Sequence, residues 1–345
     1  MEMMKKLAAM ILVTMMLFGA CAQADYRMGE AAKDAGNIEQ ALTYWQEAAE
    51  QGDAEAAYEL GKMYYTADGV EQDDEAAFEY FLMAAQQNLA KAQYAVGICY
   101  DDGRGVEMDD AAALEWYQKA AEQGIADAME WAGILMQDAQ DYAAAMEWYL
   151  KAYEHGNGIV ANRIAVLYDL GQGVKQDEEK AMYWYTAAAQ AGSKAAQYNI
   201  GTFYELGRGV EQDYAAAIEW FKKSLETEPD YVNAMEQIGW MYTQGGYGIE
   251  KDHAAALEWM MKAYEKGSAY AASVAGWAYW VGGYGVEQDY AAALEWYTKA
   301  AELGDAESMY WISEIYRRGL TAEADEALAA EWLEKAIANG YVSAE

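Results

Sequence analysis

Residues 109–121 read DDAAALEWYQKAA and residues 289–301 read DYAAALEWYTKAA, so almost the same segment occurs twice in the chain. The aromatic residue at the eighth position of this segment recurs nine times, at intervals of 32 to 39 residues. These aromatic markers are Tyr44, Tyr80, Trp116, Trp148, Trp184, Trp220, Trp259, Trp296 and Trp332. Self-similarity at a period of about 20 to 50 residues is typical of repeat proteins. The sequence therefore predicts nine copies of one structural unit.

The second half of each repeat is predicted to be a helix that starts at a capping residue seven positions before the marker. The capping residues are Asn37, Asp73, Asp109, Asp141, Asp177, Asp213, Asp252, Asp289 and Asp325. Asp and Asn side chains accept hydrogen bonds from free backbone N–H groups at a helix start, which contributes about 1 kcal/mol each. In six of these helices a glutamate precedes a lysine by four residues, as in Glu115 and Lys119. This order predicts an exposed stripe of ion pairs.

The first half of each repeat is predicted to be a helix with a small residue in its core. The pattern is an apolar residue, glycine, two residues and an aromatic residue, with the glycines at Gly61, Gly97, Gly201, Gly239 and Gly276. A glycine inside a helix costs about 1 kcal/mol relative to alanine. We therefore expect a neighbouring helix to approach closely at these positions. The Gly-x-Gly-Val or Gly-x-Gly-Ile segments that follow are predicted to be turns with positive φ.

The repeats divide the chain into four predicted segments. Residues 1–24 are a signal peptide, residues 25–52 a short N-terminal helix pair, residues 53–340 eight repeats, and residues 341–345 a C-terminal tail. Each repeat can bury its apolar face only against its neighbours. The repeats are therefore expected to form one continuous all-α solenoid.

The N-terminal segment carries the pattern of an export signal. Lys5 and Lys6 precede an apolar stretch over residues 7–20, and Ala22-Gln23-Ala24 supplies small residues on either side of a cleavage site. The alternative is a lipoprotein signal in which Cys21 carries a lipid anchor. Both alternatives predict export from a bacterial cytoplasm, to the periplasm or the exterior.

The charge of the chain excludes several kinds of partner. The sequence has 23 Lys and Arg against 58 Asp and Glu, a net charge of −35. Nucleic acids and anionic lipids bind through clusters of basic residues, so neither is an expected partner. Beyond the signal only Cys99 remains, so no disulfide is expected within one mature chain.

These motifs resemble the Sel-one-like repeat family of the tetratricopeptide superfamily. The resemblance rests on Ala-x-x-x-Leu-Gly-x-x-Tyr, Gly-x-Gly-Val-x-x-Asp and Ala-Leu-Glu-Trp-Tyr-x-Lys-Ala-Ala, and it extends over residues 25–340. It implies a right-handed superhelix of antiparallel helix pairs, with the first helices on the concave side. It also implies an adaptor or scaffold role. The fourth repeat departs from the pattern because it lacks the Gly-x-Gly turn, and Ala165 and Ser313 replace the core glycine in the fifth and last repeats.

Aromatic and acidic residues at the positions that the superfamily places on the concave side are candidate contacts for a partner. We select Tyr58, Tyr65, Tyr94, Tyr198, Trp240, Tyr270, Trp277, Trp280, Tyr310, Glu205, Glu236 and Glu314. Aromatic rings beside carboxylates can stack on Arg or Lys side chains and pair with their charge. The predicted partner is therefore a protein or peptide with basic residues. The alternative for many of these rings is packing against the adjacent repeat.

Other functional classes have less support in the sequence. The acidic runs lack the ligand spacing of a calcium loop, and His155 and His253 do not form a zinc pattern with Cys99. No motif of a catalytic serine, metalloprotease or phosphate loop is present. We expect no catalytic residues, no metal and no cofactor. A scaffold that binds carbohydrate or a cell-envelope polymer remains the alternative, and a hydrolase is the least favoured reading.

Overall fold

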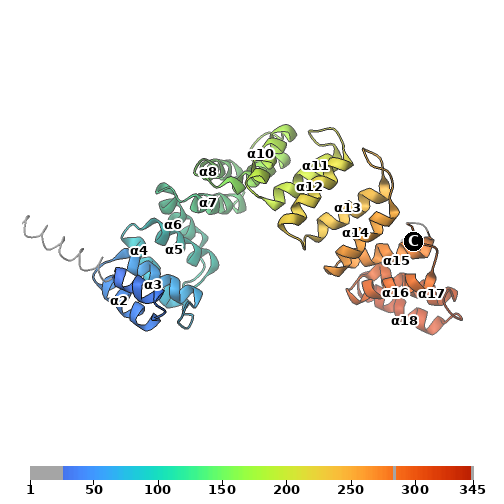
Figure 1. Ribbon diagram of the computed structural model, residues 1–345, viewed down its shortest axis with the longest axis horizontal. Helices are drawn as coiled ribbons and strands as arrows, with labels where there is room; N and C mark the ends of the chain where they lie inside the picture. The colour runs from blue at the N-terminus through green and yellow to red at the C-terminus, as the bar shows by residue number, and fades with distance from the viewer. Residues whose placement is uncertain (1–25, 283–284, 343–345) are drawn as a thin grey trace, which may run out of the picture. The chain divides into compact units, whose positions relative to one another are not determined.

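The structure, a computed structural model, describes residues 26–282 and 285–342. These residues form helices joined by turns, with one isolated backbone bridge between Gly246 and Ile249 (Figure 1). The prediction of an all-α fold is therefore confirmed for this part of the chain. The predicted signal peptide, including Cys21, lies outside the described residues.

The helices alternate between the two halves of each repeat. The first helices are residues 26–34, α3 Ala54–Thr66, α5 Ala90–Asp102, α7 Ala126–Asp138, α9 Ala161–Leu170 (after the 3-10 turn η1 Gly158–Val160), α11 Lys194–Leu206, α13 Val232–Gln244, α15 Ala269–Val281 and α17 Ala306–Arg318. The second helices are α2 Ile38–Glu50, α4 Asp74–Gln86, α6 Asp110–Glu122, α8 Tyr142–Glu154, α10 Glu178–Gln190, α12 Tyr214–Thr227, α14 His253–Glu265, α16 Tyr290–Glu302 and α18 Glu326–Ala338.

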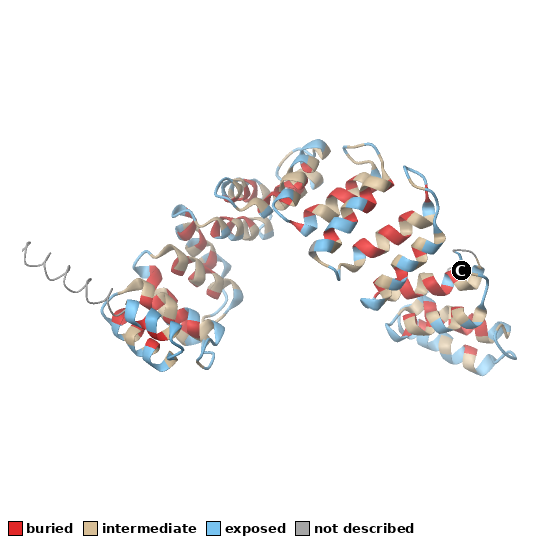
Figure 2. Cartoon of the chain, viewed as in Figure 1, coloured by how far each residue is buried: buried red, intermediate tan, exposed pale blue. Residues whose placement is uncertain are grey.

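The chain divides into two compact units, Met1–Gln176 and Asp177–Glu345, which we call the N-terminal and the C-terminal unit. The N-terminal unit contains the helices up to α9, and the C-terminal unit contains α10 to α18. Within each unit, a second helix such as α4 or α14 packs against the first helix of its own repeat and against the first helix of the next. Figure 2 shows the buried residues along these helix-to-helix contacts.

The predicted capping residues begin all nine second helices. The side-chain oxygen of each accepts a hydrogen bond from a backbone N–H group two or three residues further on, at 2.9 to 3.4 Å. These bonds satisfy N–H groups that have no partner within the helix. This part of the sequence prediction is confirmed.

The core glycines are explained by the residue that follows each aromatic marker. Tyr117 is completely buried, and a Cβ atom added at Gly97 would lie 2.6 Å from a carbon of its ring. The same contact joins Gly61 to Phe81 and Gly201 to Phe221. The expected close approach is therefore confirmed, and the neighbouring group is an aromatic ring of the second helix. In the seventh repeat the residue in this place is a methionine, Met260.

The aromatic markers themselves are half-buried, and in six repeats a lysine three residues later covers the ring. The distances from the lysine Nζ to the ring centroid are 3.8 to 4.3 Å, for Lys119, Lys151, Lys223, Lys262, Lys299 and Lys335. Ion pairs of 2.7 to 2.8 Å confirm the predicted stripe at Glu258–Lys262, Glu295–Lys299 and Glu331–Lys335. The sequence prediction included the ion pairs but not the ring contact.

The turns after the first helices bring each repeat against the preceding one. Gly105 has a φ of +70°, and a Cβ atom there would lie 1.9 Å from the backbone oxygen of Asp74 in the previous repeat. Arg104 lies between the turn glycines Gly103 and Gly105. It donates hydrogen bonds to the Asp74 carboxylate at 2.6 Å and to the backbone oxygen of Tyr65 at 3.2 Å. Arg208 makes the corresponding contact with Glu178 at 3.0 Å. The predicted turn is confirmed, and its arginines brace neighbouring repeats.

Candidate partner-binding site

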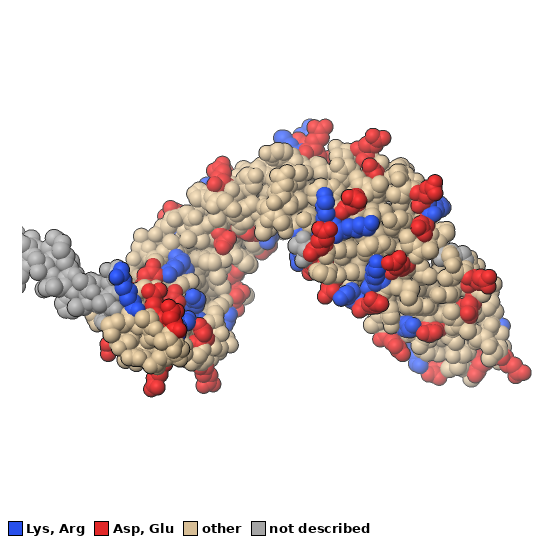
Figure 3. Space-filling model, viewed as in Figure 1, with Lys and Arg blue, Asp and Glu red and all other residues tan. Residues whose placement is uncertain are grey.

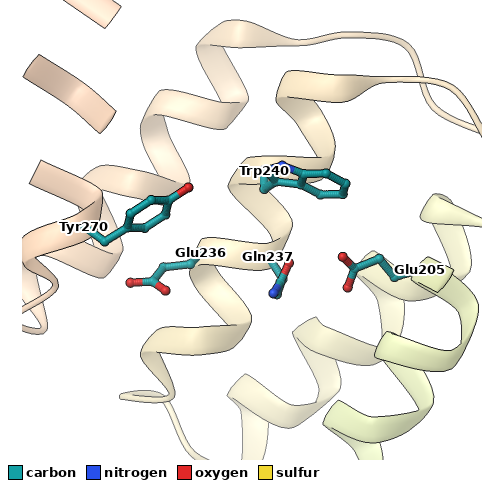
Figure 4. A pocket seen from close by; sticks show the side chains of 5 residues that line it. All are labelled: Glu205, Glu236, Gln237, Trp240 and Tyr270. Atoms are coloured by element: carbon teal, nitrogen blue, oxygen red, sulfur yellow. The ribbon is translucent and has the colours of Figure 1, made fainter. Parts of the chain in front are cut away.

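Three successive first helices of the C-terminal unit line a hollow of about 370 Å³. Its lining residues are Glu205 on α11, Glu236, Gln237 and Trp240 on α13, and Tyr270 on α15 (Figure 4). Four of these five residues are among the predicted contacts. The fifth, Gln237, follows Glu236 directly, and no residue pattern in the sequence marked it. The structure thus brings residues from three repeats to one place.

Glu205 is the most deeply buried acidic group of the hollow. It is 7% exposed, and its Oε2 atom has no hydrogen-bond partner among the described residues. Burial disfavours the charged form of a carboxyl group. It therefore raises the pKa of Glu205 to about 7. The hollow contains a carboxyl group whose charge changes near neutral pH.

The other lining residues are held by contacts with their own helices and with the neighbouring ones. The Ser268 hydroxyl donates a hydrogen bond to the Glu236 carboxylate. The Trp240 ring packs edge-on against Tyr214 of α12, with 5.9 Å between ring centroids. The Tyr270 side chain lies on the wall of the hollow and is 52% exposed. The helix α13 thus supplies the Glu236 carboxyl and the Trp240 ring, with the Glu205 carboxyl of α11 on one side and the Tyr270 ring of α15 on the other.

The predicted aromatic residues of the N-terminal unit lie against its core, and cations of the chain itself cover two of them. Tyr58 packs against Phe81 at 5.6 Å, and Lys91 covers its ring at 4.3 Å while pairing with Glu55. Arg104 lies 3.7 Å from the centroid of the Tyr65 ring. In the next repeat Tyr94 packs against Tyr117, with 5.8 Å between ring centroids. These rings do not line the hollow.

The remaining predicted residues of the C-terminal unit also lie outside the hollow. Trp277 is 41% exposed on α15, while the half-buried Trp280 packs against Trp311 at 5.2 Å. Tyr310 stacks on Tyr341 with 4.5 Å between ring centroids, and Tyr198 packs against Phe221 and Tyr231. Glu314 is 6% exposed and already pairs with Arg317 and Arg318. The hydrogen bond from Arg317 holds the pKa of Glu314 below its usual value.

The described residues hold no group of three or more His, Cys, Asp and Glu side chains arranged to bind a metal ion. In the same residues, no helix is both long and apolar enough to cross a membrane. Cys99 is fully buried, and burial raises the pKa of its thiol to about 12, which keeps the sulfur in the unreactive thiol form.

The Sel1 repeat model matches nine consecutive segments of the chain: residues 22–53, 54–89, 90–125, 127–157, 160–193, 194–226, 232–268, 269–305 and 306–341. This chain belongs to the Sel1 repeat family. The predicted resemblance is confirmed, and all nine matched segments start within three residues of the predicted repeat starts, which are residues 25, 53, 89, 125, 157, 193, 231, 268 and 305. Sel1 repeat proteins are typically scaffolds for protein–protein interaction and not catalysts.

Two solved structures resemble this Sel1 repeat protein over most of its length. One is c5321, a protective antigen present in uropathogenic Escherichia coli strains that displays an SLR fold. It is 33% identical, with a TM-score of 0.75 over 93% of this chain and 69% of that one. The other is a Sel1 repeat protein from Oxalobacter formigenes, 27% identical, with a TM-score of 0.67 over 85% of this chain and 86% of that one. A comparison with curated protein sequences finds no match. The predicted fold class, an α-solenoid of helix-pair repeats, is therefore confirmed.

Proposed function

We propose that this Sel1 repeat protein is an exported scaffold that binds a basic segment of a partner protein across α11, α13 and α15. The observation that carries the proposal is the composition of the hollow on these helices. It combines two carboxyl groups and two aromatic rings, and none of its described lining residues is Lys or Arg. An unpaired carboxyl near aromatic rings suits a cationic side chain, which the rings attract through their faces.

The N-terminal unit supports this proposal because its own cations already make contacts of the same kind. Lys91 lies over the Tyr58 ring and pairs with Glu55, and Arg163 bonds Glu130 at 2.9 Å. These contacts join one first helix to the next within a single chain. We infer that a partner supplies the corresponding cation to the hollow of the C-terminal unit.

Export is proposed from the sequence of residues 1–24, and either the periplasm or the exterior is the destination. The alternative is a lipoprotein anchored through Cys21. Mass spectrometry of the mature protein distinguishes the two, because cleavage after Ala24 leaves Asp25 as the first residue. A lipid-modified Cys21 at the N-terminus supports the alternative instead.

The test of the binding proposal is affinity capture with chemical cross-linking, followed by titration of the purified partner. Trp240→Ala combined with Tyr270→Ala is expected to weaken that affinity at least about tenfold, because aromatic residues at the centre of an interface carry much of the binding energy. The matched control is Trp131→Ala, which removes a 37% exposed tryptophan from α7 of the other unit. Unchanged affinity in the double variant would contradict the proposal. If the double variant kept its affinity for the partner protein but lost a glycan binding that the parent chain shows on an array, the carbohydrate alternative would be favoured.

A further inference from the structure

In the third and fourth repeats, a glycine of the first helix contacts the buried tyrosine ring (Gly97 with Tyr117, Gly133 with Tyr149), and the polar residue four positions after it receives a hydrogen bond from the second helix. In the third repeat, the Tyr117 hydroxyl donates to the Asp101 carboxylate at 3.2 Å. In the fourth, the Tyr149 hydroxyl donates to the Gln137 side-chain oxygen at 3.0 Å. The tyrosine in each case is the residue that follows the aromatic marker. In these two repeats the polar side chain at this position is thus satisfied within its own repeat.

The sixth repeat has the acidic residue at this position but not the hydroxyl. Glu205 follows Gly201 by four residues, as Asp101 follows Gly97. The ring that contacts Gly201 belongs to Phe221, which has no oxygen to donate a hydrogen bond. The Oε2 atom of Glu205 has no partner among the described residues, although the residue is only 7% exposed. A buried polar atom without a partner is costly, so its presence points to a ligand.

We propose that Glu205 is the anchoring group of the hollow and receives one arginine or lysine side chain of the partner. The cation takes the place that the tyrosine hydroxyl has in the third repeat. This inference rests on the proposed function, because it names the group through which that surface holds its partner. Trp240 lies near the Glu205 carboxyl that would receive the cation, and Tyr270 lies farther along the hollow, beside Glu236 (Figure 4).

Binding through Glu205 would depend on pH, because a cation is attracted only to the ionised carboxyl. Burial raises the pKa of Glu205 to about 7, so the group is mostly neutral at pH 6 and mostly ionised at pH 8. The titratable groups around it are Tyr198 of α11, Tyr214 of α12 and Glu236 of α13. None of these supplies a positive charge. Affinity for a cation should therefore rise with pH.

The experiment titrates the purified chain with three capped tripeptides and follows binding by NMR. The peptides are Ala-Arg-Ala, Ala-Lys-Ala and Ala-citrulline-Ala, since citrulline keeps the shape of arginine without its charge. The better of the two cationic peptides should bind at least about tenfold more tightly than the citrulline peptide. Its affinity should rise about tenfold from pH 6 to pH 8. Comparison of the Arg and Lys peptides identifies the side chain that the hollow prefers.

Two variants test the role of Glu205 directly. Glu205→Gln keeps the shape of the side chain and is expected to remove both the preference for a cation and the pH dependence. Phe221→Tyr supplies the missing hydroxyl, and it should weaken binding of the cationic peptide severalfold because the carboxyl then has a partner within the chain. Tyrosine already occupies this register at Tyr117, Tyr149, Tyr185 and Tyr297, so the variant is expected to fold, which circular dichroism verifies.

Equal affinity for the arginine and citrulline peptides, or unchanged binding of the cationic peptide to Glu205→Gln, would overturn the anchoring role. That result is distinguishable from failure of the proposed function. The proposed function is contradicted instead if Trp240→Ala with Tyr270→Ala leaves the affinity for the purified partner unchanged.

Discussion

At the scale of single residues, the fit between a glycine and an aromatic ring determines how closely the two helices of a repeat approach. The buried Tyr117 ring occupies the space that a side chain at Gly97 would need. A glycine in a helix is unfavourable by itself, so the packing of the ring must compensate for it. In each such pair, the poor helix propensity of the glycine in the first helix is therefore offset by the packing of the aromatic ring from the second helix.

Gly97→Ala is expected to destabilise the protein by about 1 to 3 kcal/mol, because the added Cβ atom would lie 2.6 Å from the Tyr117 ring. The higher helix propensity of alanine offsets only part of this cost. Urea denaturation measures the change. The control repeats the substitution in a Tyr117→Met background, since the flexible Met260 serves at this position in the seventh repeat. An equal cost in both backgrounds would contradict the role of the ring.

Glu205 should also affect the pH dependence of stability in the absence of any partner. Burial raises the pKa of Glu205 to about 7 from its ordinary value of 4.5. The folded state therefore binds the proton more tightly than the unfolded state, and stability is lost as the pH rises from about 4.5 through 7. Glu205→Gln, which cannot ionise, should gain stability over the parent chain at pH 8 and little at pH 5. Urea denaturation at both pH values measures this. A gain that is the same at both would show that Glu205 does not titrate in this range.

At the scale of helices, most of the structure could be predicted from the sequence because the repeats contain similar core-glycine, turn and capping motifs in the same order. The nine capping residues and the core glycines needed no knowledge of the fold beyond the repeat itself. Contacts made by long side chains were harder to predict. Lys119 carries an i, i+4 partner in the sequence, yet in the structure its ammonium lies over the Trp116 ring. Lys262, Lys299 and Lys335 make both the ion pair and the ring contact, so the charge pattern alone does not predict the aromatic partner.

The candidate site was predictable in part for the same reason. The positions of Glu205, Glu236, Trp240 and Tyr270 follow from the repeat register, and these four residues share one hollow. The register did not reveal that Lys91 covers Tyr58, because this depends on the conformation of a flexible side chain. One signal was available but unused. Comparison of Phe221 with Tyr117 in the aligned repeats would have marked Glu205 as a carboxyl without a hydroxyl donor.

The helix caps lead to a prediction at this scale. Asp109→Ala should destabilise the protein by about 1 kcal/mol, because the backbone N–H groups of Ala111 and Ala112 lose an acceptor that lies 3.0 Å away. Asp109→Asn keeps the side-chain oxygen and serves as the control, with a change of a few tenths of a kcal/mol. The midpoint of urea denaturation, at an unchanged slope, gives both values. Equal losses in the two variants would mean that the charge, and not the capping hydrogen bond, is important.

At the scale of the whole molecule, the main electrostatic property is an excess of negative charge. The chain carries a net charge of −35, and Figure 3 shows acidic side chains on both units with fewer basic ones between them. Like charges at this density repel one another and destabilise a compact state. The same excess favours a partner with basic residues. It increases the rate of encounter with such a partner at low salt.

Salt should therefore stabilise this protein. Raising NaCl from about 10 mM to about 150 mM shortens the screening length from about 30 Å to about 8 Å, which weakens repulsion between distant carboxylates. Close contacts such as the 2.6 Å pair of Arg104 and Asp74 lose less. Thermal unfolding followed by circular dichroism is expected to show a higher Tm at the higher salt concentration. A falling Tm would indicate that attractive pairs outweigh the repulsion.

The central claim is that the first helices of the C-terminal unit form the surface that holds the partner. Site-specific photocrosslinking tests it directly, with benzoylphenylalanine in place of Tyr270 in the hollow and, in a second variant, in place of Tyr183. Tyr183 is 64% exposed on the second helix α10 and serves as the control. We predict a discrete adduct from position 270 that contains a basic segment of one partner protein, and none from position 183. An adduct formed equally from both positions, or only from position 183, would contradict the account.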